Sequence, residues 1–250
     1  MRLAPPLEVR ASAPLARADP LSKLAAAVVL MVALFVTVDV VTSAAIVLAL
    51  VVAFPLTGLP AGAFARRAAP LAAAAIGVAL FNSLFGERGA GGGAAAALRI
   101  VGIALAGLMA VATIEPTDLA DSLVQHTRAS PRFVVGTLAA WRLAPLFGLE
   151  WRIIGLARRA RGIESDRGVA RLADLPGRTF ILLVGAIRRA TRLALALDAR
   201  GFGRRPCRTV ARPRALGAAD LALVLAALAV AAGATALSVA LGTWRPLVSL

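Results

Sequence analysis

The sequence predicts an all-α, polytopic membrane protein with about five transmembrane helices and an inserted cytoplasmic helical domain. Three observations lead to this prediction. Of the 250 residues, 60% are hydrophobic, which is well above the share in ordinary soluble domains. Several apolar runs approach the ~20 helical residues that cross a bilayer. The formal net charge is +15, and most of the excess falls in one stretch, as in the cytoplasmic parts of membrane proteins.

The first apolar run, residues 24–54, predicts two short spans and not one long span. As a single helix it would be about 46 Å long, against a hydrocarbon core of about 30 Å. Basic residues stand on both sides of the run, among them Lys23 before it and Arg66 after it. Because basic flanks favour the cytoplasm, the chain is expected to cross twice, with a turn near Asp39.

Two further spans are predicted before the basic stretch. Proline and glycine at residues 55–62 indicate a loop, and spans are expected at 70–85 and 94–113. The glycine-rich segment 86–93 between them is interpreted as a flexible external linker. Arg99, near the start of the second of these spans, is expected to extend toward the membrane interface.

Residues 115–215 differ in composition from the rest, with 19 arginines and 8 carboxylates. Their apolar residues recur at helical spacing, which predicts amphipathic helices on the cytoplasmic side. The run 220–241 predicts a last span, which leaves the C-terminus outside. The predicted organisation is a cytoplasmic N-terminal segment (1–20), a membrane domain of four spans (21–114), cytoplasmic helices (115–215), and a final transmembrane helix with an external tail (216–250).

No arrangement of residues typical of a catalytic or metal site is found. The chain has no phosphate-binding GxxxxGK[ST] loop, no HExxH or GxSxG motif and no pair of clustered carboxylates. With one histidine, His126, and one cysteine, Cys207, neither a multi-histidine nor a cysteine metal cluster can form. We therefore expect no catalytic residues, no metal and no cofactor, and interpret His126 as a helix-end residue.

Two Ala-Arg-Gly triplets stand out within the basic stretch: Ala160, Arg161 and Gly162, and Ala199, Arg200 and Gly201. Many helices end with a basic residue followed by glycine, and that ordinary interpretation stays open. Each triplet is also expected to present a guanidinium on a helix tip, where its planar fork can bind carboxylates or helix-end carbonyls. Two such tips suit a partner with two equivalent grooves, such as a pair of related ATPase subunits.

Four other segments, in the same order along the chain, are similar to those of one family. They are Asp19-Pro20-Leu21-Ser22-Lys23-Leu24, Phe81-Asn82-Ser83-Leu84-Phe85-Gly86, Thr113-Ile114-Glu115-Pro116-Thr117-Asp118-Leu119 and Trp141-Arg142-Leu143-Ala144-Pro145-Leu146. Together with the triplets, this ordered set resembles the transmembrane T component of energy-coupling factor (ECF) transporters, the family of cobalt, biotin and thiamine-precursor permeases. Leu21 departs from the arginine that is usual there.

The resemblance implies a coupling subunit of an ATP-driven importer of a vitamin or metal ion, in the inner membrane. Two cytosolic ATPases would bind at Arg161 and Arg200, and the flanking alanines and glycines would allow their close approach. A separate membrane protein, the S component, would bind and select the substrate. The resemblance further implies that this chain is not an enzyme. We also expect no nucleic-acid partner, because the arginine-rich stretch lacks interleaved aromatic residues.

A stand-alone membrane permease or channel is the main alternative. Such a protein carries polar or charged residues inside its spans, where they form a path, whereas the predicted spans here are almost wholly apolar. Asn82 and Ser83 are the chief exceptions, and they stand at a span end. A lipid head-group enzyme would need a nucleophile or acid–base pair, and a nucleic-acid binder would need aromatic residues among its arginines.

Overall fold

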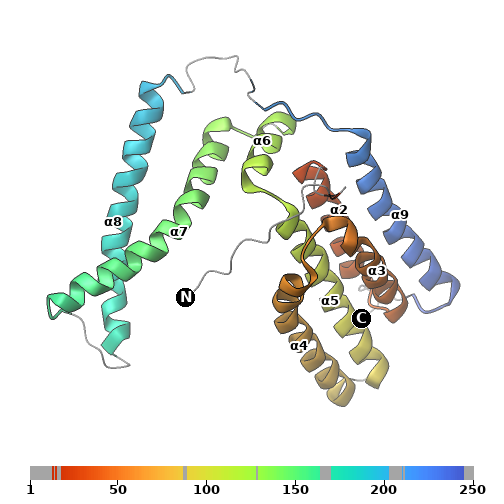
Figure 1. Cartoon of the computed structure of the whole chain (residues 1–250). Helices are drawn as coiled ribbons and strands as arrows, with labels where there is room; N and C mark the ends of the chain where they lie inside the picture. The colour runs from red at the N-terminus through yellow and green to blue at the C-terminus, as the bar shows by residue number, and fades with distance from the viewer. Residues whose placement is uncertain are drawn as a thin grey trace. The chain divides into compact units, whose positions relative to one another are not determined.

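The computed structural model describes residues 13, 15, 18–86, 89–127, 129–163, 170–202, 210 and 212–244. Within these ranges all regular structure is helical, which confirms the all-α prediction. The chain divides into two compact units (Figure 1). The membrane unit comprises Met1–His126 and Arg214–Leu250, and the insert unit comprises Thr127–Pro213.

Among the described residues, five helices are long and apolar enough to cross a membrane. They are Val40–Thr57, which joins an α-helix to the short 3-10 helix that follows it, and Ala61–Phe85, Gly89–Thr113, Pro131–Ala160 and Ala218–Ala240. There are five such helices, as predicted, but they are not the predicted five. Helix α2, Pro20–Val36, has only 17 residues and is not among them, whereas Pro131–Ala160 of the insert unit is. A polytopic helical membrane protein is thus confirmed.

The turn predicted near Asp39 is present. Helix α2 ends at Val36, and helix α3, Val40–Ala53, begins directly after Asp39. With 17 and 14 residues, these helices are about 25 and 21 Å long, so each is shorter than a typical hydrocarbon core of about 30 Å. The non-helical break therefore needs partners for its backbone groups within the protein.

Polar side chains supply those partners at the break. The backbone N–H and the hydroxyl of Thr37 both donate to the Ala33 carbonyl, at 3.2 and 2.7 Å. Asp39 Oδ2 accepts from the Thr42 N–H at 2.7 Å and from the Ser238 hydroxyl at 2.7 Å. Asp39 thus caps α3 at its N-terminus and ties it to the far end of the last helix.

Helix α4, Ala61–Phe85, begins well before the predicted start at residue 70. It follows the short 3-10 helix Phe54–Thr57 and starts after Pro60, and Pro70 lies in its interior. A proline there removes one backbone hydrogen bond, but the surrounding alanines favour helix strongly. The helix is therefore longer than the predicted span, which it contains in full and with which it shares its end at Phe85.

The glycine-rich segment is not the linker that its composition predicted. Helix α5, Gly89–Thr113, includes Gly89–Gly93 in its first turns. A Cβ on Gly93 would overlap the Ser83 hydroxyl and the Ala79 carbonyl of α4. Glycine lets the two backbones approach closely, as at other helix contacts in membranes, so this segment forms part of the α4–α5 interface (Figure 1).

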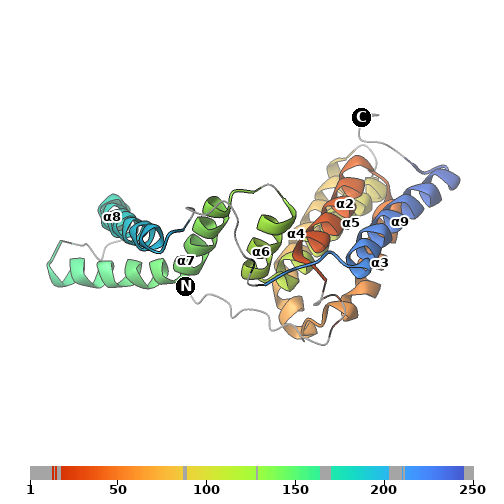
Figure 2. The same ribbon diagram turned by 90° about the horizontal axis from the view of Figure 1, so that it is seen from above.

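The last helix, α9 (Ala218–Ala240), packs against α2 and α3, as Figure 2 shows. The buried core of the membrane unit combines larger side chains such as Leu34 and Ile46 with alanines such as Ala106 and Ala234. Many small residues allow short distances between helix axes. Helix α6, Pro116–His126, also belongs to this unit, contacts α2, and ends at His126 as predicted.

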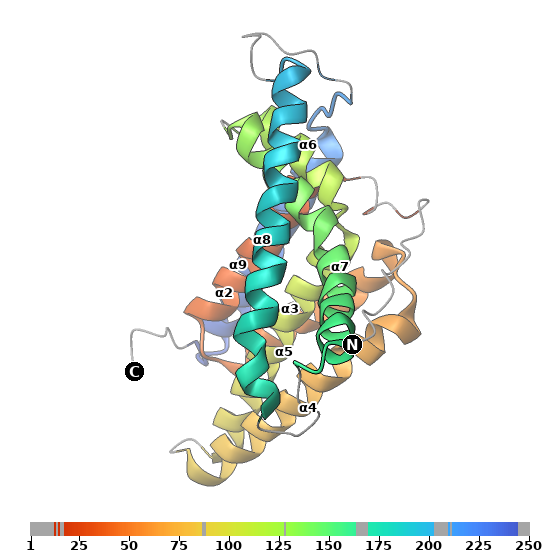
Figure 3. The same ribbon diagram turned by 90° about the vertical axis from the view of Figure 1, so that its left-hand side faces the viewer.

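The insert unit is an antiparallel pair of long helices (Figures 1 and 3). Helix α7 runs from Pro131 to Ala160 and helix α8 from Ala170 to Ala199. Helix α7 is bent along its length (Figure 1), and it contains Pro145 in its interior, where a proline is a common cause of a bend. Because the helices are antiparallel, their C-terminal ends lie at opposite ends of the pair.

Alanine substitutions at two glycines of α5 test the close approach of α4 and α5. Gly93→Ala should lower the stability of the purified protein by about 1–3 kcal/mol, because the new Cβ overlaps α4. Gly91→Ala is the matched control, since its Cβ would meet nothing within 4 Å. Thermal unfolding in detergent measures the difference, and equal melting temperatures for the two variants would contradict this packing.

Candidate functional site

The first Ala-Arg-Gly triplet closes helix α7. Ala160 is its last helical residue, Arg161 is the cap, and Gly162 has a positive φ of 67°. The Gly162 N–H donates to the Arg159 carbonyl at 2.9 Å, and the Ile163 N–H donates to the Arg158 carbonyl at 3.1 Å. This is the Schellman pattern, in which glycine occupies the left-handed position at the lowest cost.

The second triplet closes helix α8 in the same way. Ala199 is the last helical residue, and Gly201 has a φ of 74°. The Gly201 N–H donates to the Asp198 carbonyl at 2.9 Å, and the Phe202 N–H donates to the Leu197 carbonyl at 2.9 Å. The structure therefore confirms that both triplets end helices, and it gives both the same hydrogen-bond pattern. We call residues 160–162 and 199–201 the two arginine tips.

Both tip arginines, Arg161 and Arg200, are exposed, and neither pairs with a described carboxylate. The tips lie at opposite ends of the helix pair (Figure 3). A helix of 30 residues is about 45 Å long, so the two guanidiniums are separated by a distance of that order.

Other arginines of the insert unit have a structural role instead. Arg158 of α7 pairs with Asp174 of α8 at 3.3 Å, and Arg189 of α8 pairs with Glu150 of α7. The first pair is largely shielded, with side chains 17% and 15% exposed. These two pairs join the helices on either side of their crossing.

Two glycines face arginines reciprocally across the same crossing. A Cβ on Gly155 of α7 would lie 2.9 Å from a guanidinium nitrogen of Arg178 on α8. A Cβ on Gly177 of α8 would lie 2.9 Å from a guanidinium nitrogen of Arg158 on α7. Each arginine thus packs on bare backbone, and Arg178 also lies over the Trp151 ring, 5.7 Å from its centroid. These contacts could not be predicted from the sequence, because no local pattern pairs a glycine with an arginine on another helix.

A buried polar network joins helix ends of the membrane unit. Asp220 Oδ1 accepts from the Asp19 N–H at 2.6 Å and from the Ser22 hydroxyl at 2.9 Å. Asp19 caps α2 through the Leu21 N–H at 2.9 Å and accepts from the Ser122 hydroxyl of α6 at 2.6 Å. The segment that begins at Asp19, identified from sequence by resemblance alone, therefore brings the starts of α2 and α9 together with α6.

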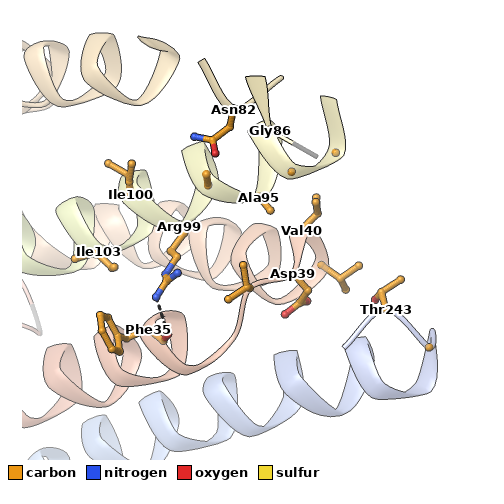
Figure 4. A pocket seen from close by; sticks show the side chains of 16 residues that line it. Phe35, Asp39, Val40, Asn82, Gly86, Ala95, Arg99, Ile100, Ile103 and Thr243 are labelled. Atoms are coloured by element: carbon orange, nitrogen blue, oxygen red, sulfur yellow. Dashed lines mark hydrogen bonds between the residues drawn. The ribbon is translucent and has the colours of Figure 1, made fainter. Parts of the chain in front are cut away.

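A cavity of about 1010 Å³ lies next to the break between α2 and α3 (Figure 4). Arg99 lines it, and its guanidinium donates to the Phe35 carbonyl at 2.6 Å and lies 5.1 Å from the Phe35 ring centroid. This carbonyl belongs to the last turn of α2, where helix carbonyls lack partners within the helix. Arg99 therefore caps the C-terminal end of a neighbouring helix, and the expectation that it extends toward the membrane interface stays a prediction.

Two other polar side chains that line this cavity, Asn82 and Asp39, also form hydrogen bonds with helix backbones. The Asn82 amide donates to the Val78 carbonyl one turn earlier, at 3.0 Å, and Asp39 caps α3. Within the described part of the chain, no group of three His, Cys, Asp or Glu side chains could hold a metal ion.

The fold and these sites define a multi-pass helical membrane protein. Comparison with known proteins identifies its family, since the cobalt transport protein family CbiQ matches residues 11–209, and the chain belongs to this family. It is similar to the energy-coupling factor transporter transmembrane protein EcfT of Heliobacterium modesticaldum, with 29% identity over 238 residues that cover 85% of this chain and 89% of the relative. The resemblance stated from the sequence is confirmed, and the chain is a membrane transport subunit.

The positive φ values at the arginine tips predict a graded response to substitution. Gly162→Ala and Gly201→Ala should each destabilise the last turn of their helix by about 1–2 kcal/mol, because alanine is strained in the left-handed region. Asparagine, which tolerates that region better, should cost less at both positions. Hydrogen exchange of the last-turn amides measures the effect. Gly148→Ala is the control, because Gly148 lies inside α7 and is not among the glycines with a positive φ. A similar increase in amide exchange in the control variant would contradict the prediction.

Proposed function

We propose that this chain is the transmembrane coupling subunit of an ECF-type importer, and that Arg161 and Arg200 each dock into one of two cytosolic ATPases. The observation that carries the proposal is the pair of arginine tips. They share one hydrogen-bond pattern, present exposed guanidiniums and lie at opposite ends of one helix pair.

The spacing of the tips favours two partners over one. Tips separated by a distance on the order of 45 Å exceed the reach of a single groove, and their equal geometry suits two related subunits. Each tip offers a planar fork of donors for a carboxylate or a helix-end carbonyl of an ATPase. The relative from Heliobacterium modesticaldum is a transmembrane protein of an energy-coupling factor transporter, which supports the same role here.

In this proposal residues 115–215 face the cytoplasm and the protein resides in the inner membrane. Helix α7 then lies outside the bilayer, although its length and composition alone would let it cross. The arginine excess of this segment supports that orientation. A separate membrane S component binds the vitamin or metal ion, and this subunit joins it to the ATPases without performing chemistry itself.

The cavity beside Arg99 is the feature that would favour a stand-alone permease. Arg99, however, caps α2, and Asp39 caps α3 through Oδ2, while Asp39 Oδ1 is buried without a hydrogen-bond partner among the described residues. A transport path needs several polar groups that are available to a passing solute, and most residues that line this cavity are apolar or glycine, so we favour the coupling role.

Substitution of the tip arginines tests the proposal. Loss of a charged hydrogen bond costs about 1.5–3 kcal/mol, which is about 10- to 150-fold in affinity. We expect Arg161→Ala and Arg200→Ala each to weaken ATPase association by this factor, and the double variant nearly to abolish it. Lysine should rescue poorly because it lacks the planar fork. Co-purification of the ATPases provides the measurement.

The controls are Arg188→Ala and Arg192→Ala, which remove exposed arginines from the side of α8. Arg158 is unsuitable because it pairs with Asp174, and Arg204 lies outside the described residues. If the double tip variant retains normal ATPase association, or if the controls lose it equally, the tips are only helix ends.

A second prediction concerns nucleotide. The purified subunit alone should neither bind nor hydrolyse ATP, because its sequence has no phosphate-binding loop. Hydrolysis measured in a preparation in which mass spectrometry detects no ATPase subunit would overturn the proposed function.

A further inference from the structure

The insert unit joins the membrane unit through two connections, and residues at these connections contact each other. Helix α6 precedes the insert unit, and Arg214 follows it. The Arg214 N–H donates to Gln125 Oε1 at 2.8 Å, and its guanidinium pairs with Asp118 Oδ2 at 2.5 Å. Because Asp118 and Gln125 both lie on α6, the chain leaving the insert unit is fastened to the helix that leads into it.

Arg214 contacts α6 in two ways, through an ion pair of its side chain and through a hydrogen bond of its backbone. The side chains of Arg214 and Asp118 are 27% and 26% exposed, so they are only partly open to solvent. The carboxylate of Asp118 stands in the first turn of α6, where the helix dipole stabilises a negative charge. The second contact comes from the peptide N–H of Arg214, so it fixes the backbone as well as the side chain.

Helix α6 is in turn fastened to the membrane unit. Ser122 is fully buried, and its hydroxyl donates to Asp19 Oδ2 at 2.6 Å. Asp19 precedes α2, and its N–H donates to Asp220 in the first turn of α9. A continuous series of contacts thus leads from Arg214 through α6 to the starts of α2 and α9.

We propose that Arg214 is a positioning residue that clamps both connections of the insert unit to α6. With these contacts, a displacement of the insert unit is transmitted to the starts of α2 and α9. Without them, α6 or residues 214–217 would loosen and absorb the displacement. The inference rests on the proposed function, because the ATPases supply the displacement. The positioning role goes beyond that function because it assigns the residue through which a displacement of the insert unit is transmitted to the membrane unit.

The first test uses the purified full chain and needs no partner. Arg214→Gln removes the charged contact, which should raise hydrogen exchange of the α6 amides by about tenfold. The exchanged pair Asp118→Arg with Arg214→Asp should restore protection relative to either single change. Arg66→Gln, which removes an exposed arginine of α4, is the control. Unchanged α6 exchange in Arg214→Gln would overturn the clamp.

The second test uses the complex with its ATPases. In the unaltered protein, exchange at residues 19–23 and 217–220 should differ between the ADP-bound and the ATP–vanadate-trapped complex. Arg214→Gln should retain ATPase binding and hydrolysis but lose most of this difference, and the exchanged pair should recover it. A role limited to folding would instead lower assembly and hydrolysis together. A full nucleotide response at these segments in Arg214→Gln would overturn the positioning role.

The two proposals fail in different ways. An unaltered subunit that binds no ATPase overturns the proposed function and the positioning role with it, while the first experiment still reports on the contact. An unaltered subunit that binds ATPases but shows no nucleotide response at residues 19–23 and 217–220 overturns the positioning role alone.

Discussion

The buried carboxylate of Asp220 holds together parts of the chain that are far apart in sequence. It accepts from the N–H of Asp19, 201 positions away, from the Ser22 hydroxyl, and from the Gly217 N–H. Asp220 is 8% exposed, and a carboxylate so placed is costly unless donors surround it. Since Asp19 also accepts from Ser122 of α6, the position of α6 and the path of the chain into the insert unit depend on this group.

Geometry, more than composition, separates the arginines of the insert unit into two kinds. Arg158 and Arg178 lie against glycines of the opposite helix, where the absence of a Cβ leaves room for a guanidinium. Arg161 and Arg200 are exposed beyond the last turn of their helices. The two kinds are close in the chain, because Arg158 stands one turn before Arg161. At the first tip, the packed Arg158 therefore holds the last turn of α7, from which Arg161 projects.

The features that could be predicted from the sequence are those that depend on neighbouring residues or on the distribution of charge along the chain. The break at Asp39 follows from basic residues on both flanks, and the two helix ends follow from arginine before glycine. The sequence misleads at Gly89–Gly93, since composition cannot tell a flexible linker from a helix surface that a neighbour approaches closely. It is silent on contacts such as Asp19 with Asp220, because hydrogen bonds between distant residues leave no periodic signal. The resemblance to a family located the segment at Asp19, but only the structure shows what that segment holds.

In the proposed role, movement started at the tips can reach the membrane only through contacts that do not yield on the way. The insert unit meets this requirement at its crossing, where Arg158–Asp174 and Arg189–Glu150 oppose sliding of α7 past α8. The membrane unit meets it where α6 is bonded to Asp19. Between these two parts the covalent path consists of the two connections alone, and α6 continues directly into the first of them. Without a contact to α6, residues 214–217 of the second connection would absorb a displacement of the insert unit. Because Arg214 bonds the second connection to the helix of the first, a pull on either connection becomes a pull on α6.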